Sequence, residues 1–219
     1  MTRTEHDPEH PEAIQIEPIW PVLIATLVIC SLYALLPMPL SLGPGWLLGL
    51  IVVILQIPYI TLRVKGIYRT AQVLGMIILG IITCFIAFSL GVLVYSVPKH
   101  SVAPAEMLAA AGQLWISNVL VFSLWYWRLD AGGPHARAKK GHHQQVDCFL
   151  FPQMLLKDHA AGWSPRFMDY LFLAFNTSTA FSPSDTAVLS RWAKPLVMLQ
   201  SLISLSLVAL VAARAVGII

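Results

Sequence analysis

Apolar side chains occur in long runs that contain almost no charge, and polar residues gather in the short segments between them. The long runs cover about residues 19–36, 45–62, 71–97, 105–127 and 195–213. A transmembrane helix needs about 20 consecutive apolar residues, so each run is close to the length of one crossing. A sixth apolar segment, residues 167–181, is shorter and carries Asp169 and Asn176. The pattern predicts an all-α, polytopic transmembrane helix bundle with five long spans plus one short or re-entrant segment.

Composition supports this interpretation and excludes several classes of protein. Of the 219 residues, 57% are hydrophobic and only 11% are charged, whereas soluble domains carry about 25% charged residues. A large soluble catalytic domain and a dinucleotide-binding fold are therefore excluded. No nucleophile–base pair, phosphate-binding loop or zinc-protease motif occurs in the sequence. We expect no enzyme and no cofactor, and the lipid bilayer rather than nucleic acid as the partner.

The polar segments divide the chain into four regions. An acidic tail over residues 1–18 precedes a four-helix transmembrane region over 19–127, a polar cytoplasmic loop over 128–166 and a hairpin over 167–219. The loop contains residue types that bind metals, namely His142, His143 and His159 together with Asp147 and Cys148. Their spacing matches no standard metal site. The three histidines are thus weak candidates only, and no metal is assigned.

Lysine and arginine are sorted strongly between the two sides of the membrane. If residues 167–181 re-enter, 12 of the 14 Lys and Arg lie on the side of the N-terminus, against Lys99 and Arg214. If the segment crosses, Arg191 and Lys194 change sides and Arg214 returns, which gives 11 against 3. Basic residues concentrate on the cytoplasmic side. Both counts place the N-terminus in the cytoplasm, and neither decides between crossing and re-entrance.

The hairpin concentrates polar side chains in a segment that is otherwise suited to the membrane. Its candidate pore or vestibule residues are Asn176, Thr177, Ser178, Thr179, Ser182, Ser184, Asp185, Gln200 and Ser204. Such groups are costly in hydrocarbon unless they are paired or wet. One interpretation is a polar pore lining. The other is a short helix whose hydroxyls bond to its own carbonyls, beside a last helix whose Gln200 and Ser204 serve helix packing.

The C-terminal half also contains motifs that resemble known families. Trp-Tyr-Trp at 125–127, Gly-Gly-Pro at 132–134, Phe-Leu-Phe-Pro at 149–152 and the 177–186 segment follow in this order. Over about residues 115–215 the chain resembles an uncharacterised family of bacterial inner-membrane proteins, a domain of unknown function. This resemblance implies a multi-pass protein of the bacterial inner membrane and no particular activity.

The same hairpin is similar, more distantly, to the pore region of potassium channels. In that comparison Thr177 and Thr179 fall on the hydroxyl end of the pore helix and Asp185 on the terminal aspartate. Ser182 and Ser184 replace the filter glycines, whose backbone freedom a carbonyl filter requires. A potassium-type filter is therefore not expected.

Two functional hypotheses follow. The first is an ion-channel-like or small-solute-conducting protein, assembled as a homo-oligomer around residues 167–213. The second is a non-conducting structural or partner-binding membrane protein that acts through the 128–166 loop. A third, weaker hypothesis is a role at the lipid surface, because cytoplasmic basic clusters attract anionic headgroups.

Overall fold

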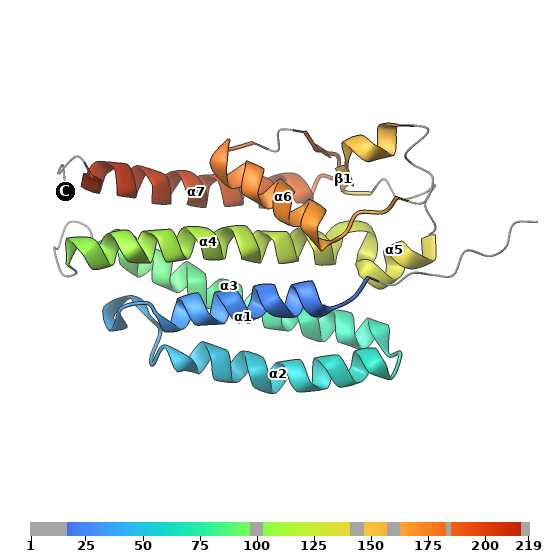
Figure 1. Ribbon diagram of the computed structural model, residues 1–219, viewed down its shortest axis with the longest axis horizontal. Coiled ribbons are helices and arrows are strands. Elements are labelled where there is room, and N and C mark those ends of the chain that lie inside the picture. The colour runs from blue at the N-terminus through green and yellow to red at the C-terminus, as the bar shows by residue number, and fades with distance from the viewer. Residues whose placement is uncertain (1–16, 97–102, 141–146, 157–162, 183–184, 216–219) are drawn as a thin grey trace, which may run out of the picture.

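The computed structural model describes residues 17–96, 103–140, 147–156, 163–182 and 185–215 as a bundle of long helices (Figure 1). Its helices are α1 (Trp20–Ala34), α2 (Trp46–Val64), α3 (Tyr68–Ser96), α4 (Pro104–Leu129), α5 (Pro134–Lys140), α6 (Phe167–Thr179) and α7 (Ala193–Ala215). Short 3₁₀ turns are η1 (Met38–Leu40), η3 (Asp130–Gly132) and η5 (Pro152–Leu155), and the strands are β1 (Phe149–Leu150) and β2 (Ala187–Val188). The all-α helical bundle expected from the sequence is confirmed.

Four helices in the described part of the chain are long and apolar enough to cross a membrane, namely α2, α3, α4 and α7. The fifth expected span is shorter than predicted, because α1 contains only 15 residues. Pro37 and Pro39 follow it, and a residue that precedes proline is disfavoured in the helical conformation. The expectation of five long spans is thus corrected to four long helices and one shorter apolar helix beside them.

Helix α4 forms the centre of the bundle. It packs against α1 and α3 on one side and against α6 and α7 on the other (Figure 1). In its most apolar window 61% of the residues are buried, compared with 17% in α2. Leu27, Val53 and Leu202 are among the large apolar side chains that point outward from α1, α2 and α7. Such a surface suits hydrocarbon rather than water, which agrees with a membrane protein.

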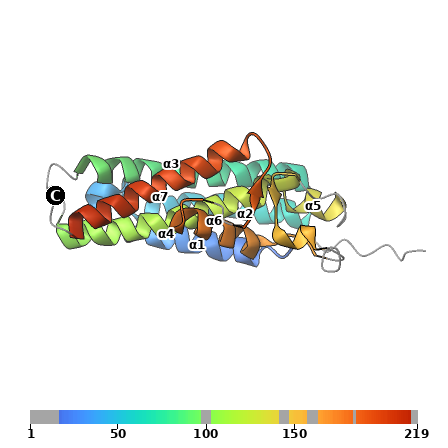
Figure 2. The same ribbon diagram turned by 90° about the horizontal axis from the view of Figure 1, so that it is seen from above.

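The segment that contains α6 starts and ends at the same end of the bundle. It begins close to the end of α4, as the distance of 6.5 Å between the ring centroids of Phe167 and Trp127 shows. After α6 the chain returns to the same end, where β2 pairs antiparallel with β1, Val188 opposite Phe149. One residue further along, the amide of Leu189 donates to the carbonyl of Cys148, which precedes β1, at 2.8 Å. Figures 1 and 2 accordingly show α6 as a short helix along the first part of α7.

The bundle therefore has one strongly basic end, which we call the cationic end. Here α2 and α4 finish and α3, α6 and α7 begin. The described Lys and Arg side chains at this end are Arg63, Lys65, Arg69, Arg128, Arg137, Lys139, Arg166, Arg191 and Lys194. Arg214 lies at the opposite end, close to the end of α7.

Candidate functional site

Three of the expected pore residues meet inside the bundle, where they join α4, α6 and α7. Ser178, Gln200 and Ser204 are fully buried. Gln200 Nε2 donates to Ser178 Oγ at 2.8 Å and to Ala174 O at 2.7 Å, and its Oε1 accepts the Tyr126 hydroxyl at 2.5 Å. Both amide hydrogens and the amide oxygen of Gln200 are thus engaged within the protein.

A second bond extends this cluster along the same helices. Asn118 Nδ2 donates to Ser204 Oγ at 2.8 Å, and Asn118 is itself buried. Asn118 and Tyr126 were not singled out from the sequence. The available signal for Asn118 was an amide inside the apolar run 105–127, and Tyr126 belongs to the Trp-Tyr-Trp motif at 125–127. The polar side chains at this depth form interhelical bonds, as in packed membrane helices.

The remaining expected pore residues do not converge on this cluster. Thr177 Oγ1 donates to Leu173 O at 2.8 Å and Thr179 Oγ1 to Phe175 O at 3.0 Å, which are bonds within α6. Asn176 is half-buried, and Ser182 and Asp185 are exposed. Ser184 lies outside the described residues, as do the histidine candidates at 142, 143 and 159. Within the described part of the chain, no three His, Cys, Asp or Glu side chains gather as a metal site would require.

The cationic end contains a second buried cluster, centred on Asp130. Asp130 Oδ2 accepts the Tyr170 hydroxyl at 2.6 Å, and Oδ1 accepts the amide of Cys148 at 3.0 Å. Arg137 Nη1 donates to the carbonyls of Trp127 and Asp130 at 2.6 and 2.9 Å. Burial raises the pKa of the Cys148 thiol to about 11, so this thiol stays protonated at neutral pH. The cluster fixes the start of the 128–166 segment on the bundle.

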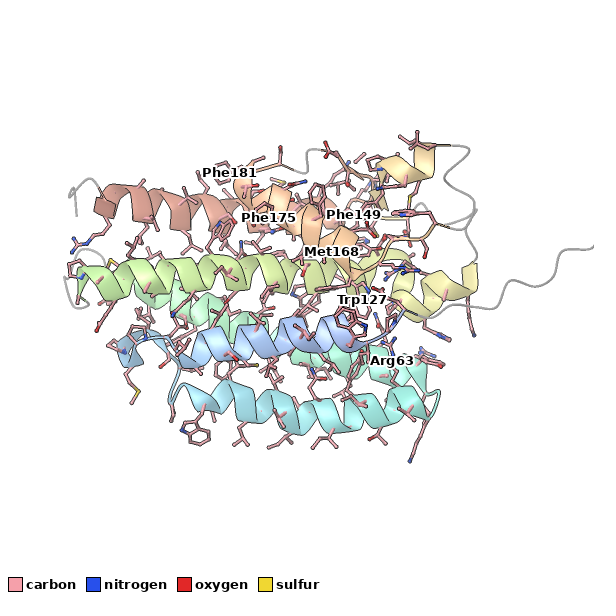
Figure 3. The ribbon with its side chains drawn as sticks, in the orientation of Figure 1. Arg63, Trp127, Phe149, Met168, Phe175 and Phe181 are labelled. Atoms are coloured by element: carbon pink, nitrogen blue, oxygen red, sulfur yellow. The ribbon has the colours of Figure 1, made fainter. Side chains whose placement is uncertain are left out.

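Glu17 ties three helices together at the same end. Its carboxylate accepts the indole N–H of Trp127 and the amide of Phe167, both at 2.6 Å. Its backbone carbonyl accepts Arg63 Nη2 at 2.9 Å. The amide of Phe167 is one of the free donors at the start of α6, where a carboxylate is favoured by the helix dipole. Figure 3 shows Arg63 and Trp127 at this end, and Phe181 far from it, just beyond the end of α6.

Arg128 is a buried cation between α2, α3 and α4. Its guanidinium lies 5.2 Å from the Tyr59 ring, and Gly75 leaves the space that it occupies. The Nε of Arg128 and the Oε1 of Gln56 are buried without a hydrogen-bond partner among the described residues. Both residues line a cavity of about 20 Å³, which is enough for one water molecule.

Next to Arg128, a pocket of about 380 Å³ opens at the cationic end. It is lined by residues of α2, α3, the end of η3 and the start of α5: Tyr59, Arg63, Tyr68, Arg69, Ala71, Gln72, Val73, Met76, Gly132, Pro134, His135 and Ala136. The rings of Tyr68 and His135 stack at 3.7 Å and hold α5 over α3. Gln72 Nε2 donates to the carbonyl of Arg128 at 2.7 Å. The pocket thus combines basic and aromatic side chains with an apolar wall.

No family model, no curated protein and no solved structure matches this chain. The resemblances to an inner-membrane family and to channel pores therefore stay predictions, and function is argued from the geometry alone.

Proposed function

We propose that this chain is a non-conducting, multi-pass membrane protein that binds an anionic ligand at the cationic end of its bundle. The observation that carries the proposal is the pocket beside Arg63 and Arg69. Its lining contains two arginines and a histidine and no aspartate or glutamate among the described residues. Concave sites with an apolar wall and a few convergent polar groups are the usual form of ligand sites.

The alternative of conduction through the hairpin has less support. Gln200, Ser178 and Ser204, which a pore would need to face water, are buried and bonded to one another or to α4. The hypothesis that the 128–166 loop binds a partner is partly included in this proposal, because α5 supplies His135 to the pocket wall.

The basic end gives the proposed orientation and location. With nine described Lys and Arg side chains at the cationic end and Arg214 opposite, the positive-inside rule orients the pocket toward the cytoplasm. We propose the bacterial inner membrane as the location, on the family resemblance of residues 115–215. A homo-oligomer is no longer required by the function, since the pocket is formed within one chain.

The test has two arms. The purified full chain in a neutral detergent is melted in the presence of phosphate, sulfate, glycerol phosphate, an anionic phospholipid and a zwitterionic phospholipid. At least one anionic compound should raise the apparent Tm in a saturable manner, because ligands that bind the folded state stabilise it. In liposomes, the protein should pass no more K⁺ or Cl⁻ than protein-free vesicles.

Two results would count against this proposal. The absence of stabilisation by every anion would exclude the proposed binding function. An ion flux that disappears in the Asp185→Leu variant would support the conducting hypothesis instead.

A further inference from the structure

We infer that the ligand of this pocket is an anionic membrane phospholipid, whose phosphate lies near Arg63 and Arg69 and whose chains begin along the apolar wall. The inference rests on the proposed function and names its ligand. Three features of the pocket carry it: arginines that bond to no carboxylate among the described residues, an opening toward the lipid-facing surface, and the buried cation behind it.

Among the residues that the structure describes, no carboxylate forms a hydrogen bond with the arginines of the pocket. The recorded hydrogen bonds of Arg63 go to neutral oxygens, namely the Tyr59 hydroxyl at 3.4 Å and the Glu17 carbonyl at 2.9 Å. The carboxylate of Glu17 is occupied by Trp127 and Phe167 instead. Arginine binds phosphate oxygens through its fork of N–H donors. The charge at Arg63 and Arg69 therefore suits a phosphate group.

The wall of the pocket is apolar and reaches the outer surface of α3. Ala71, Val73 and Met76 line it, and Val73 is 49% exposed. This surface of α3 faces hydrocarbon in a membrane, since Ile77 one turn further is also exposed. A ligand can thus enter sideways from the bilayer. A phosphate ion would leave this wall uncovered, whereas a phospholipid covers it with the start of its chains.

A buried cation lies directly behind the pocket. Tyr59 lines both the pocket and the small cavity beside Arg128. Its hydroxyl is 3.4 Å from Arg63 Nη1 and 3.5 Å from Arg128 Nη2. The positive charge of Arg128 adds to the potential in the pocket, because charges act over longer distances in a low-dielectric interior. Basic pockets of this kind between transmembrane helices bind anionic lipid headgroups.

The experiment measures apparent affinity from the rise in Tm of the full chain in neutral detergent. The probes are phosphatidylglycerol, phosphatidylcholine and inorganic phosphate. The variant Arg63→Gln/Arg69→Gln is compared with Arg191→Gln/Lys194→Gln, which removes two charges at the same end but outside the pocket. A third variant, Val73→Trp, covers the lateral opening at an exposed position where no core contact is lost.

Phosphatidylglycerol should stabilise the native chain far more than phosphatidylcholine does. Each basic residue near anionic lipid contributes about 1 kcal/mol, so the Arg63/Arg69 variant should bind about 30-fold more weakly. The Arg191/Lys194 control should stay within about threefold of the native chain. Val73→Trp should weaken the response to phosphatidylglycerol and leave any response to phosphate unchanged.

The outcomes separate this inference from the proposed function. Equal stabilisation by both lipids, or an unchanged affinity in the Arg63/Arg69 variant, would overturn the lipid assignment. Inorganic phosphate that binds as tightly as phosphatidylglycerol would overturn it too, while the proposed anion-binding function would survive. No response to any of the anions would overturn both.

Discussion

Replacing Gln200 by leucine should destabilise the bundle measurably, because this one side chain joins three helices. Leucine has a similar volume and fits the hydrocarbon surroundings, so the loss reports mainly on hydrogen bonds. The bonds lost are those with the Tyr126 hydroxyl, Ser178 Oγ and Ala174 O. Interhelical bonds in membrane proteins contribute about 0.6 kcal/mol each on average and at most about 1.7. Three such bonds give about 2 kcal/mol.

The assay is the free energy of unfolding in mixed micelles with increasing dodecyl sulfate. The matched control is Ser206→Ala on the same helix. Ser206 is exposed, and among the described residues its hydroxyl donates to Leu202 O within α7. The control should change the free energy of unfolding by less than about 0.5 kcal/mol.

A double-mutant cycle assigns the energy to a specific contact. Gln200→Leu combined with Tyr126→Phe should show a coupling of about 0.6 to 1.7 kcal/mol, since the two residues share one bond. If Gln200→Leu unfolds at the same dodecyl sulfate concentration as the native chain, the argument that these polar groups hold the hairpin in place is refuted. A conducting role for the cluster would then regain support.

Three further predictions test the cationic end and the path of the chain. Gly75→Ala should cost about 1 to 3 kcal/mol of stability in the same micelle assay, because the added Cβ would lie 1.9 Å from Arg128 Nη1; native-like unfolding would contradict the close approach. Glu17→Gln should lower the free energy of unfolding by about 1 to 3 kcal/mol, since an amide replaces the carboxylate oxygens that accept Trp127 and Phe167; an unchanged value would show that the contact contributes nothing. A cysteine in place of Arg191 should react with a membrane-impermeant maleimide from the side opposite to one in place of Ala105, and labelling of both from one side would exclude a re-entrant α6.

The spans were predictable because the thickness of the bilayer sets the length of an uncharged run. The runs at 45–62, 71–97, 105–127 and 195–213 correspond to α2, α3, α4 and α7. The helix formed by the run at 19–36 is shorter than the run itself. The prolines that follow disfavour the helical conformation in the residues just before them, so the helix ends before the apolar residues do.

The return of the chain after α6 was not predictable from the sequence, because the two charge counts differ by a single residue. The path is decided by contacts between distant segments. Val188 pairs with Phe149, and Cys148 is held by Asp130 at the end of α4. A pattern within one segment carries no information on such pairings.

The Gln200 cluster and the pocket at the cationic end differ in how far the sequence predicted them. Ser178, Gln200 and Ser204 stood out as polar groups in apolar segments. Their pairing inside the bundle could be inferred from the free energy that an unpaired polar group costs in hydrocarbon. The pocket itself was not predicted, because the sequence indicated an orienting role for the cytoplasmic basic clusters and, in the third hypothesis, a role at the lipid surface, without placing Arg63 and Arg69 in a cavity. Its other polar residues, Gln72 and His135, come from segments more than 60 residues apart in the chain, and only the packing of α5 on α3 brings them together.

Helix α6 connects the pocket at the cationic end with the Gln200 cluster, and these contacts explain how a helix that stops inside the bundle is stable. A half-helix in a membrane needs partners for its polar groups at both ends. At its start the amide of Phe167 donates to the carboxylate of Glu17. The backbone carbonyl of Glu17 in turn accepts a hydrogen bond from Arg63 of the pocket. Near its far end Ser178 and the carbonyl of Ala174 bond to Gln200. Glu17 thus holds the start of α6, and Gln200 holds its far end.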